Sequence, residues 1–261
     1  MDKSAKTTAT KTTRFKCVCA YDGTDFCGWQ SQPNNLAIQD FIETRLSAIF
    51  KEKIRIHGSG RTDAGVHADA QVFHFDAIWK HSPTALLSAL RVGMPEALQI
   101  VSLKKVSNNF HARYSVVGKR YIYKICEGQA SPKIARYHWS IGNRKLDIDA
   151  INESAKILLG THDFTSFSAS RGTDTKDNPI KTLFQLEAKR NKNIVTISTR
   201  GTGYMYKMVR MLVGALVDVG LGKFTQDDIQ QILDAKKRGS YKFATAPAKG
   251  LSLNKVFYKS K

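Results

Sequence analysis

The first half of the chain alternates between strand-like and helix-like hydrophobic patterns. Phe15, Cys17 and Cys19 recur at every second position, which predicts a strand over residues 14–21. From 37 to 50 the apolar positions recur every three or four residues, as is typical of an amphipathic helix. The remaining elements expected here are strands at 54–56 and 70–75 and a helix that begins at Ser82-Pro83 and ends before Gly93.

The second half repeats this alternation. Thr225 is a typical N-cap for a final helix, with Asp227 and Asp228 near its positive end. Because strands and helices mix without a regular βαβ repeat, we expect an α+β fold with a mostly antiparallel sheet flanked by helices. The other elements predicted in this half are strands at 121–125 and 194–198 and helices at 146–159 and 207–219.

Two polar segments lie outside these patterns. Residues 1–13 are rich in Thr and Lys, which predicts a disordered tail. Residues 168–179 are rich in Ser, Gly, Asp and Asn, which predicts an exposed loop. We expect the folded part to divide into an N-terminal lobe, 14–107, and a strongly basic C-terminal lobe, 108–261.

Charge is the most unusual feature of the composition. The chain has 41 Lys and Arg against 22 Asp and Glu, a formal net charge of +19. From Lys189 to Lys261 there are 15 basic and 4 acidic residues. Such a field attracts polyanions, so the composition favours nucleic acid as the partner. An anionic membrane surface is the second candidate, but no strongly basic amphipathic helix favours it.

The cysteines and the hydropathy narrow the class of protein. None of the four cysteines forms a Cys-x-x-Cys pair, and no His cluster completes a zinc-ligand pattern, so we expect no metal site. Free buried thiols in a reducing compartment are the simplest interpretation, and they favour the cytoplasm. No apolar run approaches the roughly 18 residues that a membrane span requires. We therefore expect no membrane association.

Residues 58–69, GSGRTDAGVHAD, carry the strongest chemical signal. Asp63 stands among small residues, two positions after Arg61, so a large planar ligand can approach the backbone closely. An arginine can hold an anion or stack on a base, and a carboxylate can act as a nucleophile or base.

This segment closely resembles the active-site motif of the TruA family of tRNA pseudouridine synthases. Further blocks resemble the family in the same order, and together with the segments between them they span about residues 15–258. They are Tyr21-Asp22-Gly23, Gly28-Trp29-Gln30, Phe110-His111-Ala112-Arg113, Lys119-Arg120-Tyr121, Gly160-Thr161-His162-Asp163-Phe164, Tyr204-Met205-Tyr206-Lys207-Met208-Val209-Arg210 and Ala246-Pro247-Ala248-Lys249-Gly250-Leu251. Tyr204 departs from the pattern, because Phe is common there.

The resemblance implies two similar α+β lobes with an active-site cleft between them. It implies isomerisation of uridine to pseudouridine at positions 38–40 of the tRNA anticodon arm, without a cofactor and by a homodimer. It assigns the role of essential carboxylate to Asp63, of its ion-pair partner to Arg210, of active-site tyrosine to Tyr121 and of nucleotide extrusion to Arg61. For Tyr121 we favour stacking on the target base, with proton transfer as a second role, because an unperturbed tyrosine hydroxyl is a poor base at neutral pH. Attack on the ribose, attack on the base and removal of a ribose proton all remain open for Asp63.

Simpler interpretations stand beside these assignments. The simpler role for Arg61 is that of a turn arginine paired with Asp22 or Asp25. We interpret His67 as a structural hydrogen-bonding residue. Asp69 has no assigned role. For the whole chain, the alternative is a non-catalytic basic RNA-binding protein of the same fold. A DNA-binding regulator is a third possibility, but the sequence has no helix-turn-helix signature.

Overall fold

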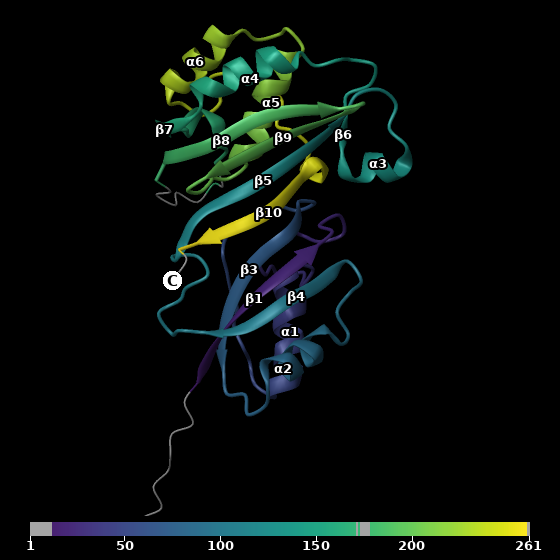
Figure 1. Cartoon of the computed structure of the whole chain (residues 1–261), viewed down its shortest axis with the longest axis vertical. Coiled ribbons are helices and arrows are strands. Elements are labelled where there is room, and N and C mark those ends of the chain that lie inside the picture. Colours follow the sequence, from purple (N-terminus) through teal and green to yellow (C-terminus); the bar gives the residue numbers. More distant parts are fainter. Residues whose placement is uncertain (1–11, 171, 173–177, 260–261) are drawn as a thin grey trace, which may run out of the picture.

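A single large sheet organises the computed structural model, which describes residues 12–170, 172 and 178–259 (Figure 1). Its strands are β1 Thr13–Tyr21, β2 His57–Gly58, β3 His67–Ala77, β4 Leu98–Val106, β5 Val116–Cys126, β6 Trp139–Ser140, β7 Gly160–Asp163, β8 Ile180–Asn191, β9 Ile194–Gly201 and β10 Leu251–Tyr258. The main order is β4-β1-β3-β10-β5-β9-β8-β7, with β2 paired to β3 and β6 paired to β5.

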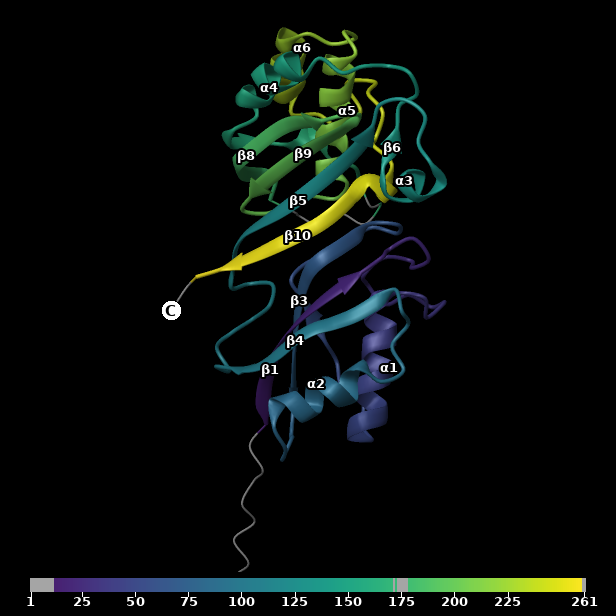
Figure 2. The same ribbon diagram turned by 45° about the vertical axis from the view of Figure 1, so that its right-hand side comes forward.

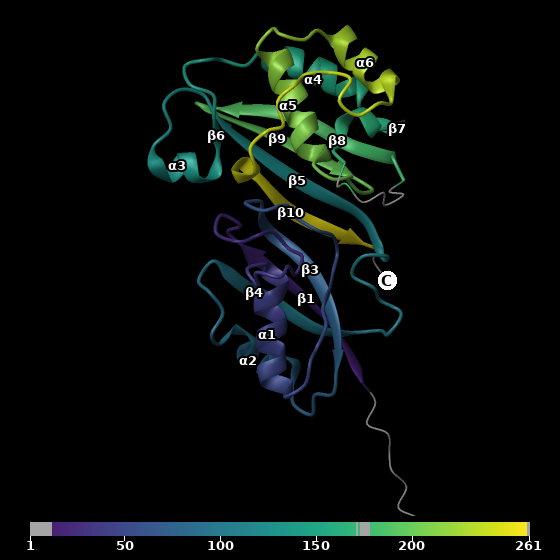
Figure 3. The ribbon, with the colours of Figure 1, turned by 180° about the vertical axis from the view of Figure 1, so that it is seen from behind.

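The helices of the described residues lie beside this sheet or pack on one another. They are α1 Ile38–Phe50, α2 Pro83–Arg91, α3 Pro132–Tyr137, α4 Ile148–Ile157, α5 Met208–Gly220 and α6 Gln226–Ala235, with 3₁₀ turns η1 Thr165–Phe167 and η2 Ala248–Gly250. Helices α1 and α5 cover the same face of the sheet, which is the near face in Figure 3. Helix α2 contacts α1, and α4 contacts both α5 and α6. The α+β fold with a mostly antiparallel, helix-flanked sheet is therefore confirmed.

The predicted sequence patterns account for the core and the helix starts. Phe15, Cys17 and Cys19 of β1 are fully buried, and all four cysteines are free thiols. The Ser82 hydroxyl accepts a hydrogen bond from the Ala85 N–H at the start of α2. At the start of α6, Thr225 and Asp228 form a reciprocal capping box. These caps satisfy N–H groups that the first helical turn leaves without a partner.

Strand β10 joins the two halves of the sheet. Figure 2 shows it between β3 and β5, although it follows both of them in the sequence by more than a hundred residues. It pairs antiparallel with β5 and parallel with β3, where Ser252 lies opposite His67 and Leu253 opposite Ala68. The strand that begins at the end of the 58–69 motif is thereby fixed beside the strand that carries Tyr121.

Several sequence-based expectations need correction. The strand predicted at 54–56 is wrong, because the strand in this region is β2, beginning at His57. Ile54 and Ile56 alternate because both side chains enter the core, not because their backbone pairs in the sheet. Strands β4, β6, β7, β8 and β10 and helix α3 were not predicted.

Other predictions concern segments that the structure describes only in part. The predicted tail, 1–13, lies outside the described residues except for its last two, and Thr13 already belongs to β1. Residues 171 and 173–177 of the predicted loop at 168–179 also lie outside them. The lobe boundary between residues 107 and 108 stays a prediction. Within the described residues, the helices are too short or too polar to cross a bilayer.

Candidate active site

A cleft of about 670 Å³ lies on the helix-covered side of the structure. Its lining comes from three distant parts of the chain: the 58–69 motif, the first half of β5 and the segment 202–210 that leads into α5. Arg61, Asp63, Tyr121 and Arg210, the four site residues expected from the sequence, all line it. The fold thus brings together side chains that are almost 150 positions apart.

Hydrogen bonds from both sides fix the loop that carries Asp63. The Thr62 carbonyl accepts from the Trp29 N–H at 3.1 Å, and the Thr62 hydroxyl lies 2.8 Å from the Tyr21 hydroxyl. On the other side, the Gln71 side-chain amide donates to the Gly60 carbonyl at 3.0 Å. Because its flanking residues are bonded to β1, β3 and the loop after β1, the Asp63 backbone has a defined position.

Two glycines allow the loop after β1 to pack directly against this motif. A Cβ on Gly23 would stand 2.0 Å from the Val66 carbonyl oxygen. A Cβ on Gly28 would stand 2.7 Å from the Thr62 carbonyl oxygen, and the φ of Gly28 is +85°, in the left-handed region. The first family-like block of the sequence therefore supports the motif sterically rather than chemically.

Asp63 and Arg210 face each other across the cleft. The Asp63 Oδ2 and the Arg210 Nη1 are 3.3 Å apart, and both side chains remain partly accessible, at 22% and 15%. The Arg210 Nε also donates to the Ala246 carbonyl at 2.7 Å, while the Arg210 carbonyl accepts from the Ala246 N–H. A guanidinium held at two points presents a fixed charge to the carboxylate. The contact that the resemblance implied is present.

Tyr121 lies beside this pair as a buried aromatic ring. It packs edge-on against Tyr204, with ring centroids 5.2 Å apart. Burial raises the pKa of the Tyr121 hydroxyl above its ordinary value, and the charge of Asp63 raises it further. The hydroxyl therefore stays protonated at neutral pH. Tyr123, two residues on, is a fully buried core side chain, and its hydroxyl donates to the Pro247 carbonyl.

The Tyr204 departure from the family pattern has a local explanation. The Tyr204 hydroxyl lies 3.0 Å from the Thr199 hydroxyl on β9, so the extra polar group has a hydrogen-bond partner. Burial raises the pKa of Tyr204 too, although the hydrogen bond to Thr199 opposes that shift. The ring itself still packs on Tyr121, as a Phe at this position would.

Arg61 is exposed at the edge of the cleft, two residues from Asp63. The simpler interpretation paired it with Asp22 or Asp25. Both of those carboxylates lie within salt-bridge distance of Arg136 on α3, at 3.2 and 3.3 Å. Its position suits contact with a ligand in the cleft.

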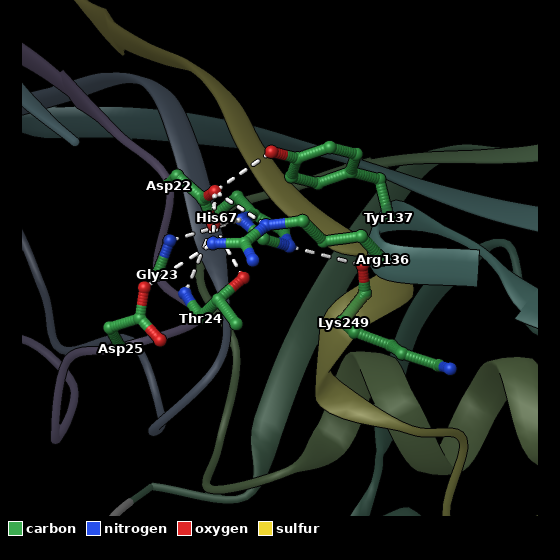
Figure 4. A network of polar contacts seen from close by, with 8 residues as sticks. All are labelled: Asp22, Gly23, Thr24, Asp25, His67, Arg136, Tyr137 and Lys249. Atoms are coloured by element: carbon green, nitrogen blue, oxygen red, sulfur yellow. Dashed lines mark hydrogen bonds and ion pairs between the residues drawn. The ribbon is translucent and has the colours of Figure 1, made fainter. Parts of the chain in front are cut away.

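His67 lies in a separate polar network on another side of the motif, outside the cleft lining (Figure 4). Its Nδ1 accepts from the Gly23 N–H at 3.0 Å, and its Nε2 lies 3.1 Å from the Lys249 carbonyl of η2. Figure 4 shows how the ring bridges two loops, which is the structural role expected. Asp69 accepts a hydrogen bond from Asn254 of β10 and also lies outside the cleft lining.

The centre of this network is Asp22. Although burial opposes its ionisation, hydrogen bonds from Thr24, Tyr137 and Arg136 hold the pKa of its carboxyl well below the usual range. Because Tyr137 and Arg136 belong to α3, the network ties that helix to the end of β1 beside the motif (Figure 4).

Sequence reasoning missed several residues of the cleft. Lys119 precedes Tyr121 by two positions on β5, and side chains at that spacing point to the same face of a strand. This two-residue period of a strand is the sequence signal that could have identified Lys119 as a cleft residue. His57, His111 and the exposed Tyr114 form one end of the cleft, but only the fold brings β2 and the loop before β5 together there. Among the described residues, no group of three or more His, Cys, Asp or Glu is arranged to hold a metal ion.

Comparisons with known proteins agree with this geometry. The family model described as tRNA pseudouridine synthase matches residues 18–115 and 154–259. A tRNA pseudouridine synthase A of Exiguobacterium sibiricum is 40% identical over 94% of this chain and 96% of its own length. A tRNA pseudouridine synthase A 1 of Protochlamydia amoebophila is 41% identical over the same shares of the two chains.

The likeness to solved structures is much weaker. A chain in the crystal structure of a Cbf5-Nop10-Gar1 complex aligns with 78% of this chain and 45% of its own length, at 13% identity and a TM-score of 0.35. That value is too low to support a conclusion about the site. The family model and the similarity over nearly the whole length of the relatives, together with the Asp63–Arg210 pair, show that this chain belongs to the family of tRNA pseudouridine synthases.

Proposed function

We propose that this protein converts uridine to pseudouridine in tRNA, at positions 38–40 of the anticodon arm, with Asp63 as the essential carboxylate. The observation that carries the proposal is the Asp63–Arg210 pair beside Tyr121 in one cleft. Family membership and the names of the relatives support the reaction and the class of RNA. The positions within the tRNA rest on the resemblance of the motifs.

The reaction places a clear demand on the site. The bond between uracil N1 and ribose C1′ breaks, the base turns, and a new bond joins C5 to C1′. The C5 proton is lost and N1 carries a proton in the product, so atoms and electrons balance without an oxidant or a second substrate. Asp63 serves this sequence by attacking C1′, by attacking the base or by removing a ribose proton.

The other residues hold the reactants. Arg210 orients the carboxylate, because its guanidinium is fixed by both Asp63 and the Ala246 carbonyl. The Tyr121 ring stacks on the target base, a contact that contributes about 1–3 kcal/mol per base in single-strand binding. Because the Tyr121 hydroxyl stays protonated, positioning is its main role. Arg61 at the cleft edge helps to hold the nucleotide extruded from its stack.

The partner and the assembly follow from charge and family resemblance. The net charge of +19 suits the backbone of tRNA. We propose a homodimer in the cytoplasm, with tRNA lying across both subunits and no cofactor. In this assembly the N-terminal lobe, 14–107, contributes Asp63, and the C-terminal lobe, 108–261, contributes Tyr121 and Arg210.

Tritium release from tRNA labelled at uridine C5 tests the reaction directly. The wild type is expected to release tritium, and Asp63→Asn to do so at least about 10³-fold more slowly with the same thermal stability. Substrates with uridine at only one of positions 38, 39 and 40 then test the specificity. If the wild type released no more tritium than Asp63→Asn, the protein would be a non-catalytic RNA-binding member of the fold.

A further inference from the structure

Lys119 is a cation of the cleft that the catalytic assignments leave unused. It lies on β5, on the same face of the strand as Tyr121, and it lines the cleft. Burial lowers its pKa to about 8, and the nearby charge of Arg113 adds to that effect. Within the described part of the chain, no acidic side chain acts on Lys119 in the opposite direction. A partly buried ammonium without a counter-ion is costly until an anion reaches it.

The Lys119 ammonium rests directly on the motif loop. A Cβ added to Gly60 would stand 2.2 Å from the Lys119 Nζ, well inside contact distance. The Gly60 carbonyl is fixed by the Gln71 side chain, so the backbone under the ammonium has little freedom to move. Gly60, three residues before Asp63, therefore keeps open the space that this charge occupies.

The rest of the cleft lining is also cationic. Asp63 is the single carboxylate among its described lining residues, and it already faces Arg210. The basic residues of the lining are Arg55, Arg61, Arg113, Lys119, Lys181, Lys207 and Arg210. The ligand that completes the charge balance of this cleft must be an anion.

We propose that Lys119 binds a backbone phosphate of the target nucleotide. The proposal rests on the proposed function and adds a second point of attachment to it. Positions two apart on a strand are about 7 Å apart, a span comparable with the ribose that separates a base from its phosphate. Once the N1–C1′ bond has broken, base and ribose are no longer joined. Tyr121 then holds the base while Lys119 holds the sugar-phosphate backbone for the second bond.

Binding of tRNA at several salt concentrations tests this role. The measurements use Asp63→Asn protein, in which we expect turnover of the substrate to be at least about 10³-fold slower. Adding Lys119→Gln is expected to weaken binding about 10-fold and to reduce the slope of log affinity against log salt by about 1. Lys119→Arg is expected to restore most of the affinity and most of the salt slope. Lys124→Gln, on the opposite face of the same strand, is the matched control and is expected to leave the slope nearly unchanged.

Gly60→Ala provides an independent test. The new methyl group displaces the lysine, so this variant is expected to weaken binding and to add little further loss to Lys119→Gln. Additive losses, or an unchanged salt slope for Lys119→Gln, would overturn the phosphate assignment. In the active enzyme, Lys119→Gln is expected to raise KM more than it lowers kcat. If the wild type released no tritium, the proposed function would fail, while the binding measurements would still decide whether Lys119 holds a phosphate.

Discussion

At the scale of single residues, the site depends on charges that the backbone holds in place. Arg210 is fixed by the Ala246 carbonyl as well as by Asp63, and Asp63 is fixed through its neighbours Thr62 and Gly60. The sequence motifs indicated which carboxylate and which arginine meet. They gave no sign that Lys119 rests on Gly60, because that contact depends on the spacing between β5 and the motif loop.

Substitution of Arg210 separates charge from geometry. Arg210→Ala leaves Asp63 without its partner, and we expect kcat for tritium release to fall by at least about 10²-fold. Arg210→Lys keeps the charge but loses the second attachment to the Ala246 carbonyl, so we expect an intermediate loss. Equal activity of Arg210→Lys and the wild type would show that the attachment of the guanidinium to both Asp63 and the Ala246 carbonyl is unnecessary.

Tyr204→Phe tests whether the tyrosine hydroxyl matters. The substitution removes one hydrogen bond to Thr199 and keeps the ring packed on Tyr121. We expect a loss of about 1 kcal/mol in the free energy of unfolding, measured by urea denaturation, and little change in tritium release. A large loss of activity with unchanged stability would instead place the hydroxyl in the chemistry.

At the scale of elements, the sequence predicted helices better than strands. The caps at Ser82 and Thr225 are local signals, and both were confirmed. Strand β10 was missed because its register shifts between Leu253 and Lys255, which interrupts the alternation of apolar positions. In β8 the register shifts between Leu183 and Gln185, so the buried side passes from Leu183 to Leu186 and Phe184 is exposed. The pairing partners of β10, which are β3 and β5, also lie far away in the chain.

The turn after β1 provides an element-scale prediction. In Gly23→Ala the new methyl group meets the Val66 carbonyl, so either this turn or the motif loop must move. We expect a loss of about 1–3 kcal/mol in the free energy of unfolding and a fall in kcat. Gly203→Ala, whose methyl group meets nothing within 4 Å, is the control for stability. Unchanged stability of Gly23→Ala would contradict this role of the turn.

Three histidines pack where the loop before β5 meets β2 and β3. The ring centroids of His74 and His111 are 4.6 Å apart, and those of His74 and His57 are 5.0 Å apart. Burial lowers the pKa of His74 to about 4, with the charges of His111, Arg14 and His57 adding to the effect. The pKa of His111 is lowered as well, first by burial.

Stability should therefore fall in mild acid. Between about pH 6.5 and pH 4 the unfolded chain binds protons that folded His74 does not, so the free energy of unfolding decreases as the pH is lowered. Below about pH 4 the proton uptake by unfolded His74 lowers the free energy of unfolding by an amount on the order of 1–3 kcal/mol. Urea denaturation across this range should show the decrease, and His74→Gln should reduce its slope. The same slope in both proteins would contradict the explanation.

At the scale of the whole molecule, charge governs the encounter with the substrate. The net charge of +19 and a cleft with one carboxylate predict binding dominated by phosphate contacts. Between 50 and 200 mM salt we expect tRNA affinity to fall on the order of 10³-fold, measured by filter binding. A flat response would mean that contacts to bases, not to the backbone, supply most of the affinity.

The position of β10 in the middle of the sheet has a consequence for biosynthesis. This strand follows every other described helix and strand in the chain, yet it pairs with both β3 and β5. On the ribosome, the edges of those two strands must wait unpaired until residues 251–258 have been made. Asp63 and Tyr121 reach their final separation only when this last strand enters. Until then two strand edges are open to pairing with other chains, which makes protection by chaperones valuable at that stage.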